Sequence, residues 1–296
     1  MIDRRRFLST TSQAVIGAVA LTALNRTSGE AAANEPGKPG KPAKPGKLAS
    51  IGVQLYTVRG QMEKDFEDPF KQIAAIGYKE VEFAGYYNKS PKDVLAVLNR
   101  YGLTAPAAHV PLATIQTNID QAIEAAKAIG HKFLICPYLE DKDRRTLDDY
   151  RRHAEAFNRA GEACRKAGIQ FGYHNHDFEF EAKDGKLPYD LLLEQTDKDL
   201  VKMELDLYWI SKAGQNPLAY IDKYKDRFAL FHVKEMDKTP KRGITEVGRG
   251  VIDFKTIFAK TPAGAIKHYF VEQDTCPGSP FDSIKVSFDY LKQLEF

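Results

Sequence analysis

Short apolar runs alternate with longer amphipathic segments from residue 51 to the end of the chain. Tyr78–Phe83 alternates apolar and polar side chains with a period of two, which predicts a β-strand. Pro91–Arg100 has apolar residues at helical spacing, a Ser90 cap and proline at its first position, which predicts a helix. The same scheme predicts eight strands: Ile51–Val58, Tyr78–Phe83, Leu103–Val110, Lys132–Pro137, Ile169–His174, Val201–Leu207, Phe228–Lys234 and His268–Gln273.

A helix is predicted after each of these strands. Strict alternation of strands and helices implies parallel strand pairing through right-handed crossovers. Eight such units over about 250 residues fit a single closed (β/α)8 barrel, the TIM barrel of the α/β class. An open doubly wound sheet is the alternative, but no glycine-rich dinucleotide-binding motif follows the first strand. The predicted helices are Asp68–Ile76, Pro91–Arg100, Asn118–Ile129, Leu147–Ala167, Pro188–Thr196, Pro217–Tyr224, Asp253–Lys260 and Ser279–Leu294.

Four predicted strands end in side chains that are able to bind a metal ion. The stretch Ile169–Glu181, IQFGYHNHDFEFE, runs from an apolar strand into His174. Asp206, His232 and Glu272 lie at the ends of the three later strands. In a barrel the carboxyl ends of all strands meet at one face. Two imidazoles and two carboxylates at that face suit one divalent ion, such as Mn²⁺, Zn²⁺, Co²⁺, Fe²⁺ or Mg²⁺.

Each of these residues also has a purely structural interpretation. Asp206 is able to pair with Lys234 or an arginine. His232 fits equally well as a hydrogen-bonded core histidine, and Glu272 as one half of a salt bridge. The coincidence of four such residues at the strand ends of one barrel favours the metal site.

Residues 1–33 have the pattern of a cleaved export signal. The basic segment Arg4–Leu8 (RRRFL) is followed by the apolar run Ala14–Leu24 and by Ala31–Ala33, small residues that suit cleavage. The paired arginines before Phe-Leu predict the twin-arginine export machinery as a partner and a periplasmic location. An ordinary secretory signal or a retained anchor is the alternative.

Residues 34–47, NEPGKPGKPAKPGK, predict an extended, solvated linker, which leaves residues 48–296 as the folded body. Of the total net charge of +3, residues 1–33 carry +2 and residues 34–47 carry +3, so the body carries −2. A slightly acidic body gives no electrostatic reason to expect nucleic-acid binding. The pattern does not determine an oligomeric state.

The segments around the strand ends resemble the xylose isomerase-like TIM barrels, which include sugar isomerases, sugar 3-epimerases, inosose dehydratase and endonuclease IV. The resemblance covers about residues 50–295. It implies that Asp206, His232 and Glu272 are metal ligands at the sixth, seventh and eighth strands. The matching segments are VQLYTVR, GYKEVEFAG, AAHVPL, FGYHNHDFEF, MELDLYW, LFHVKEMD and FVEQD.

Two positions depart from the epimerases of this family. His174 stands where the epimerases have a fifth-strand glutamate that serves as ligand and base, which brings the chain nearer to the inosose dehydratase-like branch. Trp209 stands where the epimerases often have a substrate-binding histidine. The endonuclease IV relatives use further histidine ligands and a basic DNA-facing surface, and the acidic body argues against that function.

Further residues of the barrel mouth receive catalytic or binding roles. His176 lies two residues after His174, on the same side of the strand, and is the candidate general acid or base because an imidazole titrates near neutral pH. His174 and Glu272 are also candidate catalytic groups, and Lys234 is placed to stabilise an oxyanion. Core packing or a solvated loop is the alternative for the predicted substrate contacts, which are Tyr56, Glu82, His109, Trp209 and, in the loop Lys238–Gly250, Arg249.

These features together predict an exported, metal-dependent sugar isomerase or epimerase. Its reaction begins with removal of a proton next to a metal-bound carbonyl of a sugar, keto-sugar or polyol. A dehydratase or lyase of keto-glycosides or inososes is the first alternative, and a non-catalytic periplasmic sugar-binding protein is the second. Export disfavours a phosphorylated substrate, since such metabolites are cytoplasmic.

Overall fold

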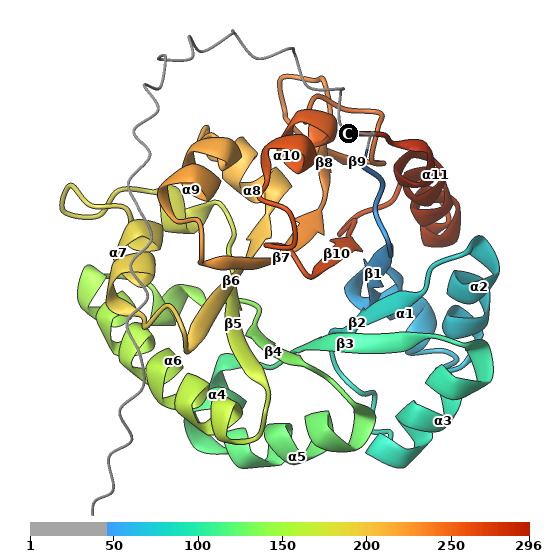
Figure 1. The fold of residues 1–296 in the computed structure, drawn as a ribbon, viewed down its shortest axis with the longest axis horizontal. Helices are drawn as coiled ribbons and strands as arrows, with labels where there is room; N and C mark the ends of the chain where they lie inside the picture. Colours follow the sequence, from blue (N-terminus) through green and yellow to red (C-terminus); the bar gives the residue numbers. More distant parts are fainter. Residues whose placement is uncertain (1–45) are drawn as a thin grey trace, which may run out of the picture. The chain divides into compact units, whose positions relative to one another are not determined.

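The computed structural model describes residues 46–296 (Figure 1). Eight parallel strands close into one barrel in the order β1-β10-β7-β6-β5-β4-β3-β2, which confirms the predicted TIM barrel. The predicted export signal, residues 1–33, and the linker up to residue 45 lie outside the described residues. The barrel strands are β1 (Gly52–Gln54), β2 (Glu80–Phe83), β3 (Thr104–His109), β4 (Phe133–Cys136), β5 (Gln170–His174), β6 (Val201–Asp206), β7 (Phe228–Val233) and β10 (His268–Val271).

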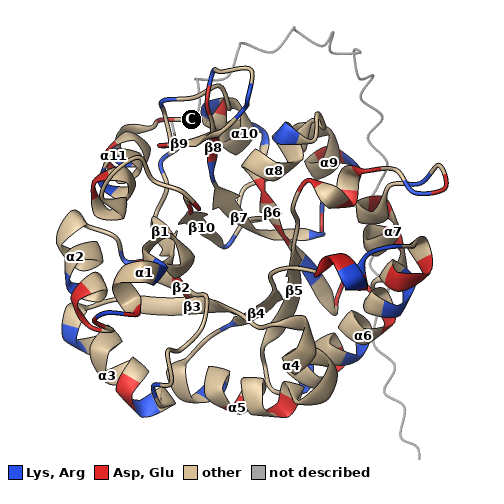
Figure 2. Cartoon of the chain, turned by 180° about the vertical axis from the view of Figure 1, so that it is seen from behind, with Lys and Arg blue, Asp and Glu red and all other residues tan. Residues whose placement is uncertain are grey.

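Helices surround the barrel on its outer side (Figure 1). None of the helices within residues 46–296 combines the length and the apolar character that crossing a bilayer requires. Basic residues (blue) and acidic residues (red) are mixed along the outer helices α3, α5 and α6 (Figure 2). The helices are α1 (Arg59–Met62), α2 (Asp68–Ile76), α3 (Pro91–Tyr101), α4 (Leu112–Thr117), α5 (Ile119–Ile129), α6 (Leu147–Lys166), α7 (Pro188–Gln195), α8 (Leu207–Lys212), α9 (Pro217–Lys223), α10 (Phe254–Lys260) and α11 (Pro280–Gln293).

Local capping explains where the longer helices begin and end. The Ser90 hydroxyl accepts the Asp93 N–H at 3.2 Å, and Pro91 occupies the first turn of α3. Gly102 ends α3 with φ at 63°, a left-handed conformation that glycine adopts at little cost. Thr146 and Asp149 form a reciprocal capping box at the start of α6.

A small apolar cluster plugs the interior of the barrel below its mouth. Leu230 and Phe270 belong to this cluster and are fully buried. Since side chains two residues apart in a strand lie on the same face, His232 and Glu272 follow them toward the mouth. His232 and Glu272 therefore stand above an apolar floor. The cluster consists of Ala107, Phe133, Ile135, Ala229, Leu230 and Phe270.

The structure differs from the predicted elements at several places, and helices α1, α4 and α8 were not predicted. The first strand ends at Gln54 rather than Val58, because the Gln54 side chain accepts the Tyr56 N–H and starts the 3₁₀-helix η1, Leu55–Val58. The sixth strand ends at Asp206, whose carboxylate caps α8. An antiparallel hairpin, β8 (Glu235–Met236) with β9 (Ile244–Thr245), follows the seventh strand where no further strand was predicted.

Candidate active site

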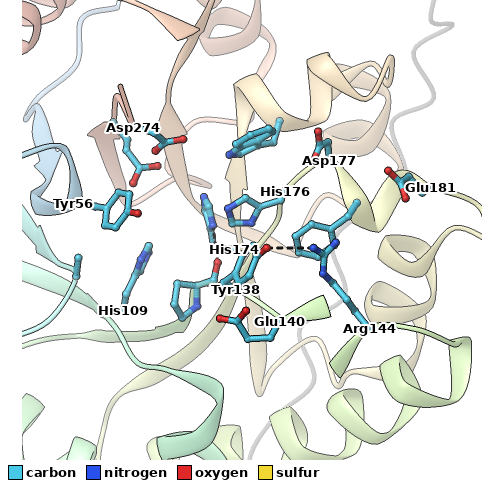
Figure 3. Close-up of a pocket in the computed structure, with 15 residues that line it drawn as sticks. Tyr56, His109, Tyr138, Glu140, Arg144, His174, His176, Asp177, Glu181 and Asp274 are labelled. Atoms are coloured by element: carbon cyan, nitrogen blue, oxygen red, sulfur yellow. Dashed lines mark hydrogen bonds between the residues drawn. The ribbon is translucent and has the colours of Figure 1, made fainter. Parts of the chain in front are cut away.

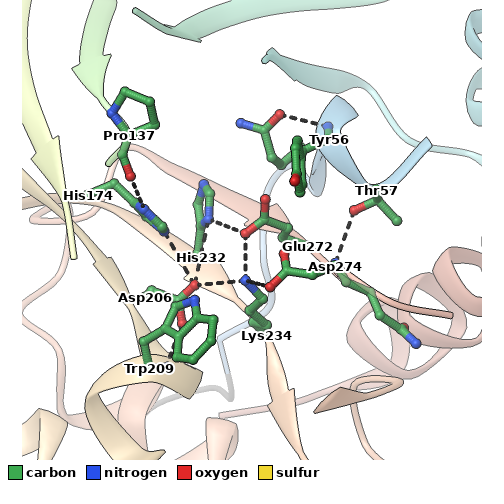
Figure 4. A network of polar contacts seen from close by, with 12 residues as sticks. Tyr56, Thr57, Pro137, His174, Asp206, Trp209, His232, Lys234, Glu272 and Asp274 are labelled. Carbon is green, nitrogen blue, oxygen red and sulfur yellow. Dashed lines mark hydrogen bonds and ion pairs between the residues drawn. The ribbon is translucent and has the colours of Figure 1, made fainter. Parts of the chain in front are cut away.

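The four side chains predicted to bind a metal ion meet at the mouth of the barrel (Figure 4). His174, Asp206, His232 and Glu272 each offer one donor atom, and these atoms all lie within 4.8 Å of one another. Asp206 Oδ2 lies 3.3 Å from His174 Nε2 and 3.8 Å from His232 Nδ1, which is itself 3.0 Å from Glu272 Oε2. All four residues are buried. The ends of β5, β6, β7 and β10 thus form one mixed nitrogen and oxygen donor set.

The hydrogen bonds around His174 leave a lone pair directed into this set. Its Nδ1 lies 3.1 Å from the Pro137 carbonyl oxygen, which only accepts, so Nδ1 carries the hydrogen. Nε2 then presents a lone pair to Asp206 Oδ2 at 3.3 Å. A cation between these two acceptors would satisfy both. A backbone carbonyl that fixes the outer imidazole nitrogen is a frequent arrangement at metal sites.

His232 contacts carboxylates through both of its nitrogens. Nε2 lies 2.8 Å from Glu82 Oε2, and Nδ1 faces Glu272. Burial opposes a charge on this imidazole, but Glu204 and Glu272 raise the pKa of His232 well above its usual value. The same negative charges that attract a proton to Nδ1 attract a metal ion. The donor set therefore fits a divalent ion in both chemistry and charge.

Lys234 neutralises part of the negative charge at the mouth. Its Nζ lies 2.9 Å from Glu272 Oε2, 2.8 Å from Asp274 Oδ2 and 3.5 Å from Asp206 Oδ2 (Figure 4). Burial opposes its charge, but the three carboxylates raise the pKa of Lys234 above its usual value. Although burial acts in the other direction, Lys234 and His232 hold the pKa of Glu272 well below its usual range. Three carboxylates against one ammonium leave two negative charges, which one divalent ion would balance.

A second buried polar layer lies next to His232. Glu204 Oε2 is 2.9 Å from His109 Nε2 and 3.2 Å from His232 Nε2. Glu82 accepts a hydrogen bond of 2.8 Å from Gln54 Nε2. Burial, followed by the charge of Glu204, raises the pKa of Glu82. This layer fixes the orientation of the His232 ring, and it places Glu82 behind the cavity wall rather than on it.

A cavity of about 750 Å³ opens above the donor set (Figure 3). The residues predicted from sequence that line it are Tyr56, His109, His174, His176, Trp209 and Glu272. Lining residues that the sequence did not single out come from the loops after β4, β5 and β10. They include Tyr138, Glu140, Arg144, Phe178 and Asp274.

His176 stands over the donor set among aromatic rings. Its ring centre lies 4.9 Å from that of His174 and 5.3 Å from that of Trp209. Its Nδ1 is buried and has no hydrogen-bond partner among the described residues. Burial, together with the nearby charge of Lys234, lowers the pKa of His176 well below its usual value. Burial therefore favours the neutral imidazole, the form that is able to accept a proton.

Arg249 lies outside the cavity, contrary to the expected position of its loop. Its guanidinium pairs with Glu246 at 3.4 Å, and more than half of its side chain is exposed. The buried Glu235 carboxylate accepts the backbone N–H groups of Gly248, Val251 and Ile252. These bonds hold the loop after β9 to the end of β7, which keeps Arg249 away from the barrel mouth.

Comparison with known proteins identifies relatives of the same architecture. Residues 70–264 match the family model for the xylose isomerase-like TIM barrel. An inosose dehydratase from Lacticaseibacillus casei is 25% identical over 269 residues, which cover 77% of this chain and 89% of the relative. A sugar phosphate isomerase/epimerase from Parabacteroides distasonis superposes with a TM-score of 0.71 at 27% identity, covering 83% of this chain and 94% of that one.

One further solved structure shares the fold alone. The IOLI protein, solved with a bound zinc atom, superposes with a TM-score of 0.64 at 12% identity, over 81% of this chain and 95% of that one. The family match extends over about two thirds of the sequence. The chain belongs to the xylose isomerase-like TIM barrel family.

Proposed function

We propose that this protein is a metal-dependent enzyme that removes a proton next to a carbonyl group of a sugar, keto-sugar or polyol. The observation that carries the proposal is the donor set of His174, Asp206, His232 and Glu272 within 4.8 Å, at the floor of a cavity that accepts a sugar. A divalent ion bound there would polarise a substrate carbonyl and make the neighbouring C–H group more acidic.

The residues around the donor set have complementary roles in this reaction. The neutral His176 accepts the proton, since its ring lies beside the donor set and lines the cavity. Lys234 lies behind the cavity wall and contacts the donor oxygen of Glu272 at 2.9 Å, so it acts indirectly, by balancing the charge of the donor set. Tyr56 and Trp209 supply aromatic faces for the sugar ring.

Two outcomes share this first step. Return of the proton to the substrate gives isomerisation or epimerisation. Elimination of the oxygen substituent on the adjacent carbon gives a dehydration when water leaves and a lyase reaction when an alcohol leaves. The inosose dehydratase relatives and the imidazole at position 174 favour elimination, whereas the sugar phosphate isomerase/epimerase structure supports the first outcome. We favour elimination because inosose dehydratases from several bacterial genera match the chain and because position 174 is an imidazole.

Incubation of the metal-loaded protein with keto-sugars and inososes in deuterated water tests the common step. We expect deuterium at the carbon next to the carbonyl, together with an enone that absorbs in the ultraviolet if elimination follows. Intact metal binding without exchange into any substrate of the panel would contradict the proposal. That result would instead support the alternative of a sugar-binding protein without catalysis.

A further inference from the structure

The cavity is larger than one sugar ring requires. A six-carbon sugar occupies a volume on the order of 200 Å³ at the packing density of organic solids. The cavity volume is about 750 Å³. A ring seated on the donor set therefore leaves space for a second group of similar size.

The cavity lining falls into two halves on either side of His176 (Figure 3). Tyr56, His109 and Asp274 lie on the side of the donor set. Arg144, Asp177 and Glu181 lie on the other side and come from the loops after β4 and β5. We call this second half the outer subsite, formed by Tyr138, Glu140, Arg144, Asp177, Phe178 and Glu181.

Aromatic rings form one wall of the outer subsite. Tyr138 and Phe178 meet edge to face, with ring centres 5.4 Å apart. His176 stacks on Phe178 at 5.4 Å with an angle of 5° between the rings. Tyr138 is 36% exposed although it lines a concave surface, so part of its ring is free to meet a ligand. Such a wall suits the apolar face of a sugar or aromatic ring.

Arg144 supplies hydrogen-bond donors to the same region. Arg144 packs over Phe178, with its guanidinium carbon 3.5 Å from the ring centre, and it donates a hydrogen bond of 3.2 Å to the Tyr138 hydroxyl. Its Nε is buried and has no partner among the described residues, and the same holds for Trp209 Nε1. The Arg144 guanidinium lines the cavity, and its terminal N–H groups suit hydrogen bonds to hydroxyl groups of a ligand.

The charges of the outer subsite select against an anionic ligand. Arg144 is its one cation, against the carboxylates of Glu140, Asp177 and Glu181. Arg144 also pairs with Asp141, which reduces its attraction for a phosphate. Carboxylate acceptors beside a guanidinium donor instead match the hydroxyl groups of an uncharged ring.

We propose that the outer subsite binds the second, uncharged ring of a glycoside, so that the substrate has two linked rings rather than one. This inference rests on the proposed function, since it assumes that the first ring sits at the donor set. Tyr138 then determines specificity through stacking on the second ring, Arg144 through hydrogen bonds to it, and Phe178 supports both residues from behind.

Calorimetric titration of the metal-loaded protein with glycosides that lack a carbonyl tests the subsite without turnover. The panel contains methyl α- and β-glucoside, methyl β-cellobioside, methyl α-maltoside and trehalose. We expect at least one two-ring compound to bind about tenfold more tightly than the single-ring compounds. Tyr138→Ala and Arg144→Gln should each remove most of this advantage. Tyr224→Ala, which truncates a tyrosine outside the cavity, should retain it.

Equal affinities for one-ring and two-ring compounds, or no binding of any compound, would overturn the inference. An advantage that survives in both folded outer-subsite variants would overturn it as well. Because these compounds have no carbonyl, the result is independent of the proposed reaction. Preferential two-ring binding without deuterium exchange into keto-sugars would refute the reaction and leave the outer subsite in place.

Discussion

At the barrel mouth, charge balance and proton transfer depend on different side chains, Lys234 and His176. Lys234 contacts three carboxylates, and its removal would leave them buried without a counter-charge. His176 has no such ionic partner and lies among Trp209 and Phe178. Because His176 makes no ionic contact with the donor set, it can be replaced without disturbing that set.

His176→Gln is therefore expected to lower the rate of deuterium exchange by about 10²- to 10⁴-fold while the metal content stays unchanged. The reason is that glutamine keeps the polarity of the position and is not able to accept the proton. Exchange is followed by nuclear magnetic resonance and metal content by elemental analysis. Glu162→Gln, on the exposed face of α6 and outside the cavity, serves as the control and should exchange as fast as the natural protein. Full activity of His176→Gln would refute the assigned role.

The sequence predicted the donor residues but not two carboxylates that lie next to them. His174, Asp206, His232 and Glu272 each end an apolar strand, which is a visible signal. Glu204 precedes Asp206 by two residues, and Asp274 follows Glu272 by two. Because residues two apart in a strand point to the same face, this spacing could have predicted that both carboxylates lie near the donor set. The roles of Tyr138 and Arg144 were not accessible, because loop conformation decides which side chains turn toward the cavity.

At the scale of elements, the turn after β5 is held by one buried carboxylate. Glu179 lies in the 3₁₀-helix η3 (Phe178–Phe180) and accepts hydrogen bonds from the Tyr173 hydroxyl at 2.5 Å and the His176 N–H at 2.8 Å. It therefore links the end of β5 to the segment that carries His176. Burial raises the pKa of Glu179 to about 8, from a usual value of 4.5.

This carboxyl group makes the stability of the protein depend on pH. Between pH 4.5 and about 8 the folded state holds a proton at Glu179 that the unfolded state releases. The free energy of unfolding should therefore fall as pH rises through this window, by an amount on the order of 3 kcal/mol. In Glu179→Gln this contribution disappears, and in Glu181→Gln it remains. Denaturant titrations from pH 5 to pH 8 measure it, and parallel slopes for all three proteins would contradict the assignment.

The elements themselves were largely predictable because alternation with period two and helical spacing are strong in this chain. All eight barrel strands were placed with errors of a few residues. The errors lie where a side chain ends a strand early, as Gln54 and Asp206 do by capping the following helix. The β8–β9 hairpin was missed because Glu235 stabilises it through loop N–H groups far along the chain.

At the scale of the whole molecule, we propose that the protein is exported to the periplasm. The proposal rests on the sequence of residues 1–33, above all on Arg4 and Arg5 before Phe7-Leu8. Replacement of both arginines by lysine should leave the uncleaved precursor in the cytoplasm, while export of the natural sequence should depend on the twin-arginine machinery. Cell fractionation followed by immunoblotting measures this. Unchanged export of the double variant would exclude that route.

The barrel brings four side chains that are distant in sequence to one point, and the central claim is that they hold a divalent ion. Elemental analysis of the purified protein tests this most directly. We predict about one equivalent of Mn, Zn, Co, Fe or Mg, lost in Asp206→Ala and in Glu272→Ala but retained in Asp177→Asn, with circular dichroism showing that each variant is folded. A folded natural protein without metal, or unchanged metal content in both alanine variants, would contradict the claim.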